Sequence, residues 1–343
     1  MTISICLYHG VDHDGECSAA IYRLWKEQHH DPRVKNLSIH QMTMKTTSEN
    51  LENSIDVYAE GPSTVHETIY FVPVDYDDRG TRIVDVLVSR ADKIDELYVL
   101  DYGFDADRTS KLQKHIKRYV WLDHHATSMK TESVLSKLPD GRRDPKSAAC
   151  ELTWNFLYAD KWMPPVVHLL GRYDVWDHSD ISVVPFEYGL LIHETYPTAY
   201  IWDPLIAQKR PVDIHQIIND GSAIVRYEKS EAQKVVSNHG IDIKLGDIDA
   251  VAINWSSLPV VGMFDRIEGD YSFAILFYLR ADGKWKYSMR RIAETVNLEP
   301  LAKYFGGGGH PGAASFVDWR APDVIFSVMS GMESEVILPR HAV

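Results

Sequence analysis

The sequence predicts an α/β fold: a doubly wound parallel sheet in the first half, a helical connector, and a smaller mixed α/β domain at the end. In the first half, short apolar runs rich in β-branched and aromatic residues alternate with segments of helical spacing. This order is typical of parallel strands joined by crossover helices. After about residue 240, several short strands follow one another directly. The 343 residues, 45% of them hydrophobic, are sufficient for two cores.

The elements of the first half are read from their apolar runs. Strands are expected at 4–8, 68–75, 96–101 and 118–123, with a weaker one near Ile39. Helices are expected between them at 15–28, 81–91 and 106–116. Because right-handed crossovers join parallel strands, these units predict one open sheet covered by helices.

From about residue 144 the chain turns helical. Asp144 is expected to be the N-cap of a helix with Pro145 at its first position. A long polar helix over 222–239 is expected to end at Gly240. Strands are then expected at 249–255, 271–280 and 284–291, with a final helix from about Asp323. The expected domains are 1–190, a helical linker at 191–239, and 240–343.

Composition excludes several classes of protein. The net charge of −13 argues against coating long nucleic acid, because such affinity depends on many Lys and Arg contacts to phosphates. The three cysteines form no CxxC pair, which argues against a disulfide framework or a thiolate zinc site. The N-terminus lacks the basic and apolar regions of a signal peptide, and no apolar run is long enough to span a bilayer. The expectation is a soluble, cytoplasmic protein.

Three predicted strands end in or just before Asp or His, in LYHGVDHD, YVLDYGFD and WLDHH, and RYDVWDH adds further aspartates. Ligands of open parallel sheets bind beyond the carboxyl ends of the strands. Carboxylates mixed with imidazoles suit a divalent ion such as manganese. They outnumber the ligands of one ion, which indicates two ions sharing a carboxylate, as in phosphoryl transfer sites. The structural alternative is that each Asp caps a helix and each His lies at the surface.

A glycine run, FGGGGHPGAASF, indicates a second binding element. Glycines allow positive φ and close backbone approach, and backbone N–H groups in such turns can cradle an anion. Arg290 and His310 would add side-chain donors, since arginine grips a phosphate with two hydrogen bonds. The alternative is a tight turn, for which one glycine would suffice.

Together these motifs resemble the DHH phosphoesterases, a family named for the triplet found here at 123–125. LYHGVDHDGECSAAI resembles the first family motif, VLDYGFD the second, WLDHHATS the third and RYDVWDH the fourth. FGGGGHPGAASF and SMRR resemble the glycine-rich and Ser-x-Arg segments of the associated C-terminal domain. The resemblance spans residues 5 to 317.

The resemblance implies roles for these residues. Two Mn²⁺ ions, with Mg²⁺ or Co²⁺ as alternatives, would be bound by His9, Asp12, Asp14, Asp101, His124 and Asp174, with Asp101 bridging. His125 would orient the substrate phosphate or act as a general acid, and Asp123 would orient a histidine. A terminal nucleotide would be held in an interdomain cleft by Ser288, Arg290, Gly306, Gly307, Gly308, Gly309 and His310.

Two positions keep alternatives. The gap between His9 and Asp12 is one residue shorter than in many relatives, so His13 could replace Asp12 as the ligand. Asp75 also follows an apolar strand and competes with Asp101, which is favoured because it lies one strand–helix unit before the DHH triplet. Trp176 and Trp285 are the aromatic residues that could contact a substrate.

The resemblance implies a manganese-dependent phosphodiesterase that degrades short oligonucleotides to mononucleotides. No membrane and no long duplex partner are expected, and the oligomeric state, a homodimer included, stays open. Alternatives with the same chemistry are a cyclic-dinucleotide phosphodiesterase and an adenosine 3′,5′-bisphosphate phosphatase. An inorganic pyrophosphatase or polyphosphatase ranks lower, because such relatives lack the GGGGH domain. The alternative of another class is a non-catalytic nucleotide-binding module on a decayed DHH fold.

Overall fold

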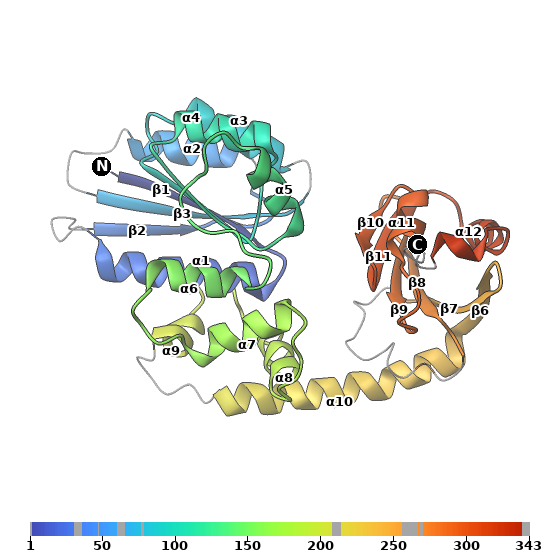
Figure 1. Cartoon of the computed structure of the whole chain (residues 1–343). Coiled ribbons are helices and arrows are strands. Elements are labelled where there is room, and N and C mark those ends of the chain that lie inside the picture. The colour runs from blue at the N-terminus through green and yellow to red at the C-terminus, as the bar shows by residue number, and fades with distance from the viewer. Residues whose placement is uncertain are drawn as a thin grey trace. The chain divides into compact units, whose positions relative to one another are not determined.

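The structure of the protein is a computed structural model that describes residues 2–30, 36–46, 48–59, 66–76, 79–207, 214–255, 267 and 270–337 (Figure 1). It divides into two compact units, Met1–Ser222 and Ala223–Val343, each described here by itself. The division falls within the range predicted as a linker, 191–239. Trp202 and Ile217 are buried in a hydrophobic cluster of the first unit, so the first part of that range packs with the first unit.

The first unit contains a five-stranded parallel sheet in the order β2-β3-β1-β4-β5. Its strands are β1 (Thr2–His9), β2 (Asn36–Gln41), β3 (His66–Val74), β4 (Glu96–Leu100) and β5 (Arg118–Leu122). The chain moves to one side of β1 through β2 and β3, then to the other side through β4 and β5. This is the predicted doubly wound sheet, and the weak strand near Ile39 is β2.

Helices cover both faces of this sheet (Figure 1). Those of the first half are α1 (His13–His29), α2 (Ser48–Ala59), α3 (Arg79–Ser89) and α4 (Ala106–His115). The α1 crossover runs across the sheet in one direction and the other three run in the opposite direction, so right-handed connections put α1 on the opposite face. In β1, Ile5 and Leu7 belong to one hydrophobic cluster, and Cys6 and Tyr8 to another that contains Tyr22 of α1. The sequence did not predict α2.

A helical region follows the sheet. Its helices are α5 (Ala126–Val134), α6 (Ala149–Leu157), α7 (Pro165–Asp174), α8 (Val183–Leu190), α9 (Trp202–Ala207) and α10 (Ile214–His239). The predicted N-cap at Asp144 is wrong, because α6 begins at Ala149 and Asp144 instead accepts a hydrogen bond from the Lys146 amide at 3.1 Å. The first amides of α6 are satisfied by Asp14 of α1, a partner that local sequence cannot reveal.

The second unit is a mixed six-stranded sheet in the order β10-β11-β9-β8-β7-β6. Its elements are β6 (Gly240–Leu245), β7 (Ile248–Asn254), β8 (Phe273–Leu279), β9 (Trp285–Arg291), α11 (Glu299–Tyr304), β10 (Gly308–His310), β11 (Ala313–Asp318), α12 (Pro322–Ser330) and a 3₁₀ turn at Ser334–Val336. The β7–β8 pair is parallel and the other pairs are antiparallel. The polar helix ends at His239 as predicted, but Gly240 begins β6 and does not form a left-handed cap.

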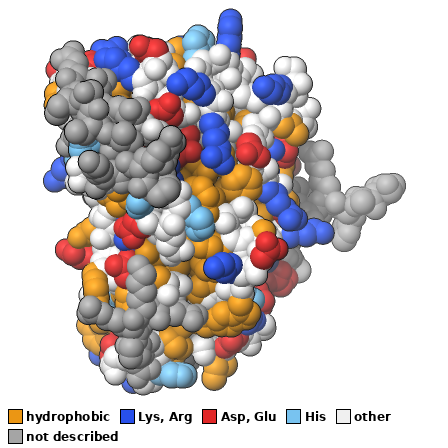
Figure 2. All heavy atoms as spheres, turned by 90° about the vertical axis from the view of Figure 1, so that its left-hand side faces the viewer, with side chains coloured by type: hydrophobic (Ala, Val, Ile, Leu, Met, Phe, Trp, Pro, Cys, Tyr) orange, Lys and Arg blue, Asp and Glu red, His pale blue; other side chains and the backbone are white. Residues whose placement is uncertain are grey.

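The surface carries mixed charge on the face shown in Figure 2. There, Lys and Arg side chains of the described residues are interspersed with Asp and Glu side chains, without one continuous basic patch. No helix in the described ranges is both long and apolar enough to cross a bilayer.

A buried ion network lies among the starts of the strands. Lys26 of α1 contacts both Glu67 and Glu96, the latter at 2.6 Å, and all three residues are less than 10% exposed. Ser4 and Tyr22 donate hydrogen bonds to Glu96 at 2.9 and 3.0 Å. The network therefore ties α1 to the sheet.

Replacing Lys26 by Met is expected to destabilise the protein by about 3–5 kcal/mol at pH 7, because buried Glu67 loses its contact with the ammonium and buried Glu96 is left with Arg118 at 3.4 Å. The loss should shrink at acid pH, where the glutamates can protonate. Urea unfolding of the full chain measures it. Lys111→Met is the matched control, since Lys111 pairs with Asp85 at 2.8 Å on the surface and should cost under about 1 kcal/mol. Equal losses in the two variants would contradict the role given to Lys26.

Candidate metal centre

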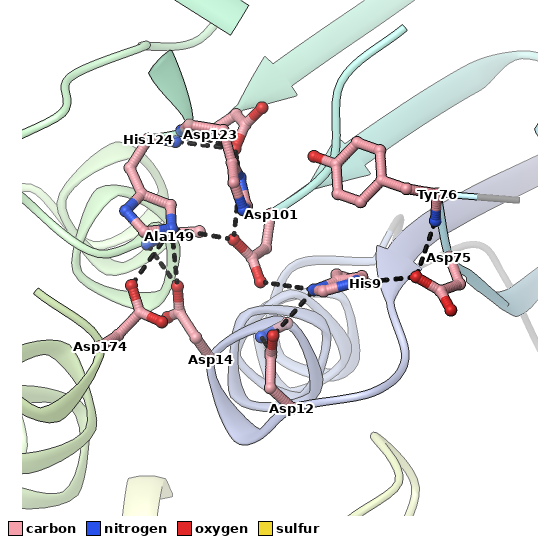
Figure 3. Close-up of polar contacts among 12 residues, drawn as sticks. His9, Asp12, Asp14, Asp75, Tyr76, Asp101, Asp123, His124, Ala149 and Asp174 are labelled. Carbon is pink, nitrogen blue, oxygen red and sulfur yellow. Dashed lines mark hydrogen bonds and ion pairs between the residues drawn. The ribbon is translucent and has the colours of Figure 1, made fainter. Parts of the chain in front are cut away.

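Acidic and imidazole side chains meet at one edge of the first sheet (Figure 3). His9 ends β1, Asp75 follows β3, Asp101 follows β4, and His124 comes shortly after β5. The first turn of α1 adds Asp14, and α7 ends at Asp174. Because the four strands are parallel neighbours, their carboxyl ends lie at the same edge, where open α/β sheets bind ligands.

The first group of three side chains contains His9, Asp12 and Asp101. His9 Nδ1 lies 2.8 Å from Asp12 Oδ2 and 3.6 Å from Asp101 Oδ2. One potential ligand atom of each residue lies within 4.8 Å of the others. The group can therefore hold one metal ion.

The second group contains Asp14, His124 and Asp174. His124 Nε2 lies 3.1 Å from Asp174 Oδ2 and 3.9 Å from Asp14 Oδ2. The same nitrogen is 3.3 Å from Oδ1 of Asp101, whose other oxygen faces His9. The two oxygens of Asp101 thus face one group each, which is the geometry of a carboxylate shared by two ions.

The electrostatics of the site fit cation binding. Burial, together with neighbouring carboxylates, raises the pKa of Asp14 and Asp101 and brings that of Asp174 to about 9. Asp101 Oδ1 and Asp174 Oδ2 are buried and accept no hydrogen bond from the described residues. Divalent cations would compensate the negative charges of these carboxylates, and the mixed carboxylate–imidazole donors suit manganese.

The carboxylates beside His9 raise its pKa. Burial alone would lower its pKa, but hydrogen bonds and charges of Asp101 and Asp12 raise it to about 11. A protonated imidazole nitrogen cannot ligate a metal, so metal binding by His9 must release a proton.

The backbone holds the ligands in place. Asp101 has a φ of 55°, a left-handed conformation that aspartate tolerates better than most residues. Asp12 is the N-cap of α1: its Oδ1 accepts the Gly15 amide at 3.0 Å, which leaves Oδ2 to face His9. A Cβ at Gly15 would lie 2.0 Å from the His9 carbonyl oxygen, so only glycine permits this close start of the helix. Asp12 therefore caps α1 with one carboxylate oxygen and faces the metal group with the other.

Asp14 is fixed by the N-terminus of α6. Its Oδ2 accepts the Ala149 amide at 2.8 Å and its Oδ1 the Cys150 amide at 2.7 Å. The positive end of the helix dipole faces this carboxylate.

Asp123 orients the two histidines that follow it in the chain. Its Oδ1 accepts the His124 amide at 2.8 Å and lies 2.8 Å from His125 Nδ1, and its Oδ2 accepts the Ser128 hydroxyl. Burial opposes ionisation of Asp123, but His125 and Ser128 outweigh it and lower its pKa. Because Nδ1 contacts Asp123, Nε2 is the ring nitrogen of His125 that this contact does not engage.

Of the two open alternatives, His13 points elsewhere. Its Nδ1 lies 2.7 Å from Glu187 of α8, and His13 belongs to none of the three-residue groups found in the described residues. Asp75 lies beside the first group, with Oδ1 3.5 Å from His9 Nε2. Tyr76, which the sequence did not single out, packs edge-on against His9 and His125 at 5.5 and 5.6 Å between ring centroids.

A pocket in the second unit contains part of the predicted substrate-binding set. Ser288, Arg290, Gly308 and Gly309 line it, together with Lys286, which the sequence analysis missed. Gly306, Gly307 and His310 do not line it.

Backbone geometry requires glycine at three of the four positions 306–309. Gly306 and Gly309 have φ of 77° and 143°, and a Cβ at Gly307 would lie 2.1 Å from the Ser315 carbonyl oxygen. Gly308 alone among the four has open space around a Cβ and an ordinary φ. The turn therefore uses more than the one glycine expected.

Comparisons with known proteins give distant likenesses. No family model matches the chain. An uncharacterized protein, R106, of Acanthamoeba polyphaga mimivirus is 22% identical over 207 residues, covering 57% of this chain. The matched region spans about half of that relative, 47% of its length.

Two solved structures are similar along most of the chain. An exopolyphosphatase-related protein from Bacteroides fragilis has a TM-score of 0.49 at 16% identity, covering 95% of this chain and 90% of its own. An uncharacterized protein from Helicobacter pylori G27 has a TM-score of 0.35 at 13% identity, covering 92% and 93%. Both TM-scores are below 0.5.

Proposed function

We propose that the protein is a metal-dependent phosphoesterase, and specifically a manganese-dependent phosphodiesterase that hydrolyses short oligonucleotides to mononucleotides. The observation that carries the proposal is two three-residue ligand groups side by side, with Asp101 belonging to the first and its other oxygen lying 3.3 Å from His124 of the second. Paired divalent ions polarise phosphoryl oxygens and lower the pKa of water to about 7. The motif resemblance to DHH phosphoesterases supports the same chemistry.

The chain's own residues would orient the substrate. His125, held by Asp123 through Nδ1, would place Nε2–H against a phosphoryl oxygen or give its proton to the leaving oxygen. Asp123 acts here as a positioning residue, since its carboxylate contacts the histidine and lies fully buried.

The negative net charge of the chain favours a short substrate over a long nucleic acid. The net charge of −13 argues against a surface that tracks a long polyanion. A pocket lined by Arg290 and Ser288 suits one terminal nucleotide.

A substrate panel tests the proposal. The full chain with Mn²⁺, with and without chelator, receives a 5′-labelled dinucleotide, a pentamer, a 24-mer, a cyclic dinucleotide, adenosine 3′,5′-bisphosphate and polyphosphate. Rapid, chelator-sensitive loss of the dinucleotide and pentamer is expected. Turnover of only the cyclic dinucleotide, the bisphosphate or polyphosphate would support the phosphoesterase chemistry but contradict the proposed substrate. No turnover of any substrate would contradict the proposal that the protein is an enzyme.

Trp176 is proposed to stack on a substrate base. It is 66% exposed, two residues after Asp174, with a φ of 63° that is strained for tryptophan. Its ring lies 5.4 Å from His178, which stacks on Tyr173 at 5.2 Å. Trp176→Ala is expected to cost about 1–3 kcal/mol of substrate binding, roughly 5- to 150-fold in KM.

Steady-state kinetics on the dinucleotide measure this effect. Trp176→Phe should retain most of the affinity, because a ring is still present. Trp162→Ala, at a tryptophan that is 71% exposed, is the matched control and should leave KM unchanged. An unchanged KM in Trp176→Ala would remove this residue from the substrate site.

A further inference from the structure

The residues that follow β3 form a corner beside His9. In the register of β1 and β3, His9 lies opposite Val74, and the Gly10 amide donates a hydrogen bond to the Val74 carbonyl at 3.0 Å. A Cβ at Gly10 would lie 2.4 Å from the Cβ of Pro73, so the chain passes this close to β3 only with glycine at that position. This pairing places Asp75, the residue after Val74, at the side of the His9 ring (Figure 3).

The two ring nitrogens of His9 face different partners. Nδ1 lies 2.8 Å from Asp12 Oδ2 and 3.6 Å from Asp101 Oδ2, the two carboxylates of the first ligand group. Nε2 lies 3.5 Å from Asp75 Oδ1, on the other side of the ring (Figure 3). Among the described residues, the three-residue groups that could hold an ion do not include Asp75. Nδ1 is therefore the nitrogen placed to ligate an ion of the first group.

Asp75 is placed to accept a hydrogen bond from the second nitrogen of His9. Its Oδ1, the oxygen that faces His9, also accepts the Tyr76 amide at 2.7 Å, which orients the carboxylate. The 3.5 Å separation from Nε2 is within ion-pair range, and a shift of less than about 1 Å would close it to a hydrogen bond. Metal-ligating histidines commonly donate their other N–H to a carboxylate, which sets the tautomer and the orientation of the ring.

Tyr76 contacts the same histidine through its aromatic ring. Its ring centroid lies 5.5 Å from that of His9 and 5.6 Å from that of His125, edge-on in both cases. On its other side the ring packs on Tyr102, which is buried, with 4.7 Å between the centroids. Edge-to-face contacts are a favoured arrangement of aromatic rings. One tyrosine, supported by a buried neighbour, thus contacts a predicted metal ligand and the histidine proposed to face the phosphate.

We propose that Asp75 and Tyr76 are positioning residues of the metal centre. Asp75 accepts the Nε2–H of His9 and so leaves Nδ1 as the ligand atom, and Tyr76 restricts the rotation of the His9 and His125 rings. Asp75 is then the partner of a ligand and not a ligand that competes with Asp101. The inference rests on the metal centre of the proposed function, but on no particular substrate.

Binding of Mn²⁺ to the metal-free full chain, followed by electron paramagnetic resonance of the free ion, tests the role of Asp75 without turnover. Asp75→Ala should weaken the binding of one ion about 10- to 100-fold and leave the second unchanged. Asp75→Asn should recover most of this affinity, because its amide oxygen can still accept the Nε2–H hydrogen bond. Asp85→Asn, at a side chain that is 67% exposed, is the matched control and should bind both ions like the wild type.

Two results of this titration would overturn the inference. The first is wild-type affinity for both ions in Asp75→Ala. The second is a loss in Asp75→Asn as large as that in Asp75→Ala, since that pattern identifies a residue that ligates the ion through its charge.

Nitrogen-15 NMR of the chain loaded with diamagnetic Zn²⁺ identifies the nitrogen of His9 that binds the ion. Nδ1 should be the bound nitrogen and Nε2 the protonated one, because Nδ1 faces Asp12 and Asp101. A His9 that binds the ion through Nε2 would overturn the inference.

Hydrolysis of a dinucleotide in Mn²⁺ measures the contribution of Tyr76. Tyr76→Leu should lower kcat roughly ten-fold with little change in KM, because the His9 and His125 rings lose their edge-on neighbour. Tyr76→Phe should keep a kcat near that of the wild type, because the ring remains. Equal kcat in Tyr76→Leu and wild type would overturn the role given to Tyr76.

The inference and the proposed function can fail separately. Mn²⁺ binding that depends on Asp75 as expected, without turnover of any substrate, would support the inference and contradict the proposed function. Turnover by a wild type whose affinity for both ions equals that of Asp75→Ala would support the proposed function and contradict the inference. A wild type that binds no Mn²⁺ would contradict both.

Discussion

Asp101→Asn is expected to reduce turnover of a short oligonucleotide by at least about 10³-fold in saturating Mn²⁺. The two carboxylate oxygens of Asp101 face His9 and His124 respectively, so the amide removes one oxygen ligand and the charge that both groups share. Single-turnover hydrolysis of a labelled dinucleotide measures the effect.

The fold of Asp101→Asn should remain intact, which separates lost chemistry from misfolding. The ionised Asp101 is disfavoured by burial and by neighbouring carboxylates, so the neutral amide should make the metal-free protein at least as stable as wild type at pH 8. Asp85→Asn, at a side chain that is 67% exposed, is the control and should keep full activity. Near-normal turnover in Asp101→Asn would remove Asp101 from the centre and return Asp75 as its competitor.

Mn²⁺ is expected to raise the melting temperature, and to raise it more at pH 8 than at pH 5. In the metal-free protein the pKa of Asp174 is about 9, and those of Asp14 and Asp101 are also raised. The folded state then binds more protons than the unfolded state from about pH 4 upward. These groups therefore destabilise the metal-free protein progressively as the pH rises toward 9, and a bound cation removes that penalty.

Scanning calorimetry with and without metal measures the effect. At 100 times its Kd, Mn²⁺ should add about 2.7 kcal/mol, which corresponds to roughly 5–10 °C for a domain of this size. Titrations in buffers of different ionisation enthalpy should show proton release, because His9 and Asp174 lose protons when they become ligands. A metal effect that is absent, or larger at pH 5 than at pH 8, would contradict the assignment.

The sequence predicted the first sheet and the edge that carries the candidate centre because the information is local. Apart from Asp174, which ends α7, each predicted ligand follows an apolar run or begins a helix, and parallel strands bring their carboxyl ends to one edge. The approach of His9, Asp101 and His124 was therefore expected, because each follows a strand predicted to be parallel to the others. Neither α2 nor β6 was predicted, although both carry a short apolar period, with Leu51 and Ile55 in α2 and alternating Ile241, Ile243 and Leu245 in β6.

Other features depend on contacts between distant residues. The Glu187 partner of His13 and the capping of α6 by Asp14 join residues 174 and 135 positions apart. Local pattern suggested Asp144 for that cap, and the buried carboxylate of Asp14 took its place. Lys286 was overlooked because a lysine in a strand is usually solvated, and only the pairing of β9 with β11 reveals its position beside Ser315.

The central claim is a pair of divalent ions sharing Asp101, and electron paramagnetic resonance of the Mn²⁺-loaded full chain tests it most directly. Two ions per chain with a spin-coupled spectrum are expected, since ions in such sites lie about 3.5–4 Å apart. Asp101→Asn should lose the coupling. A wild type that binds no manganese, or binds it only as isolated, uncoupled ions, would contradict the account.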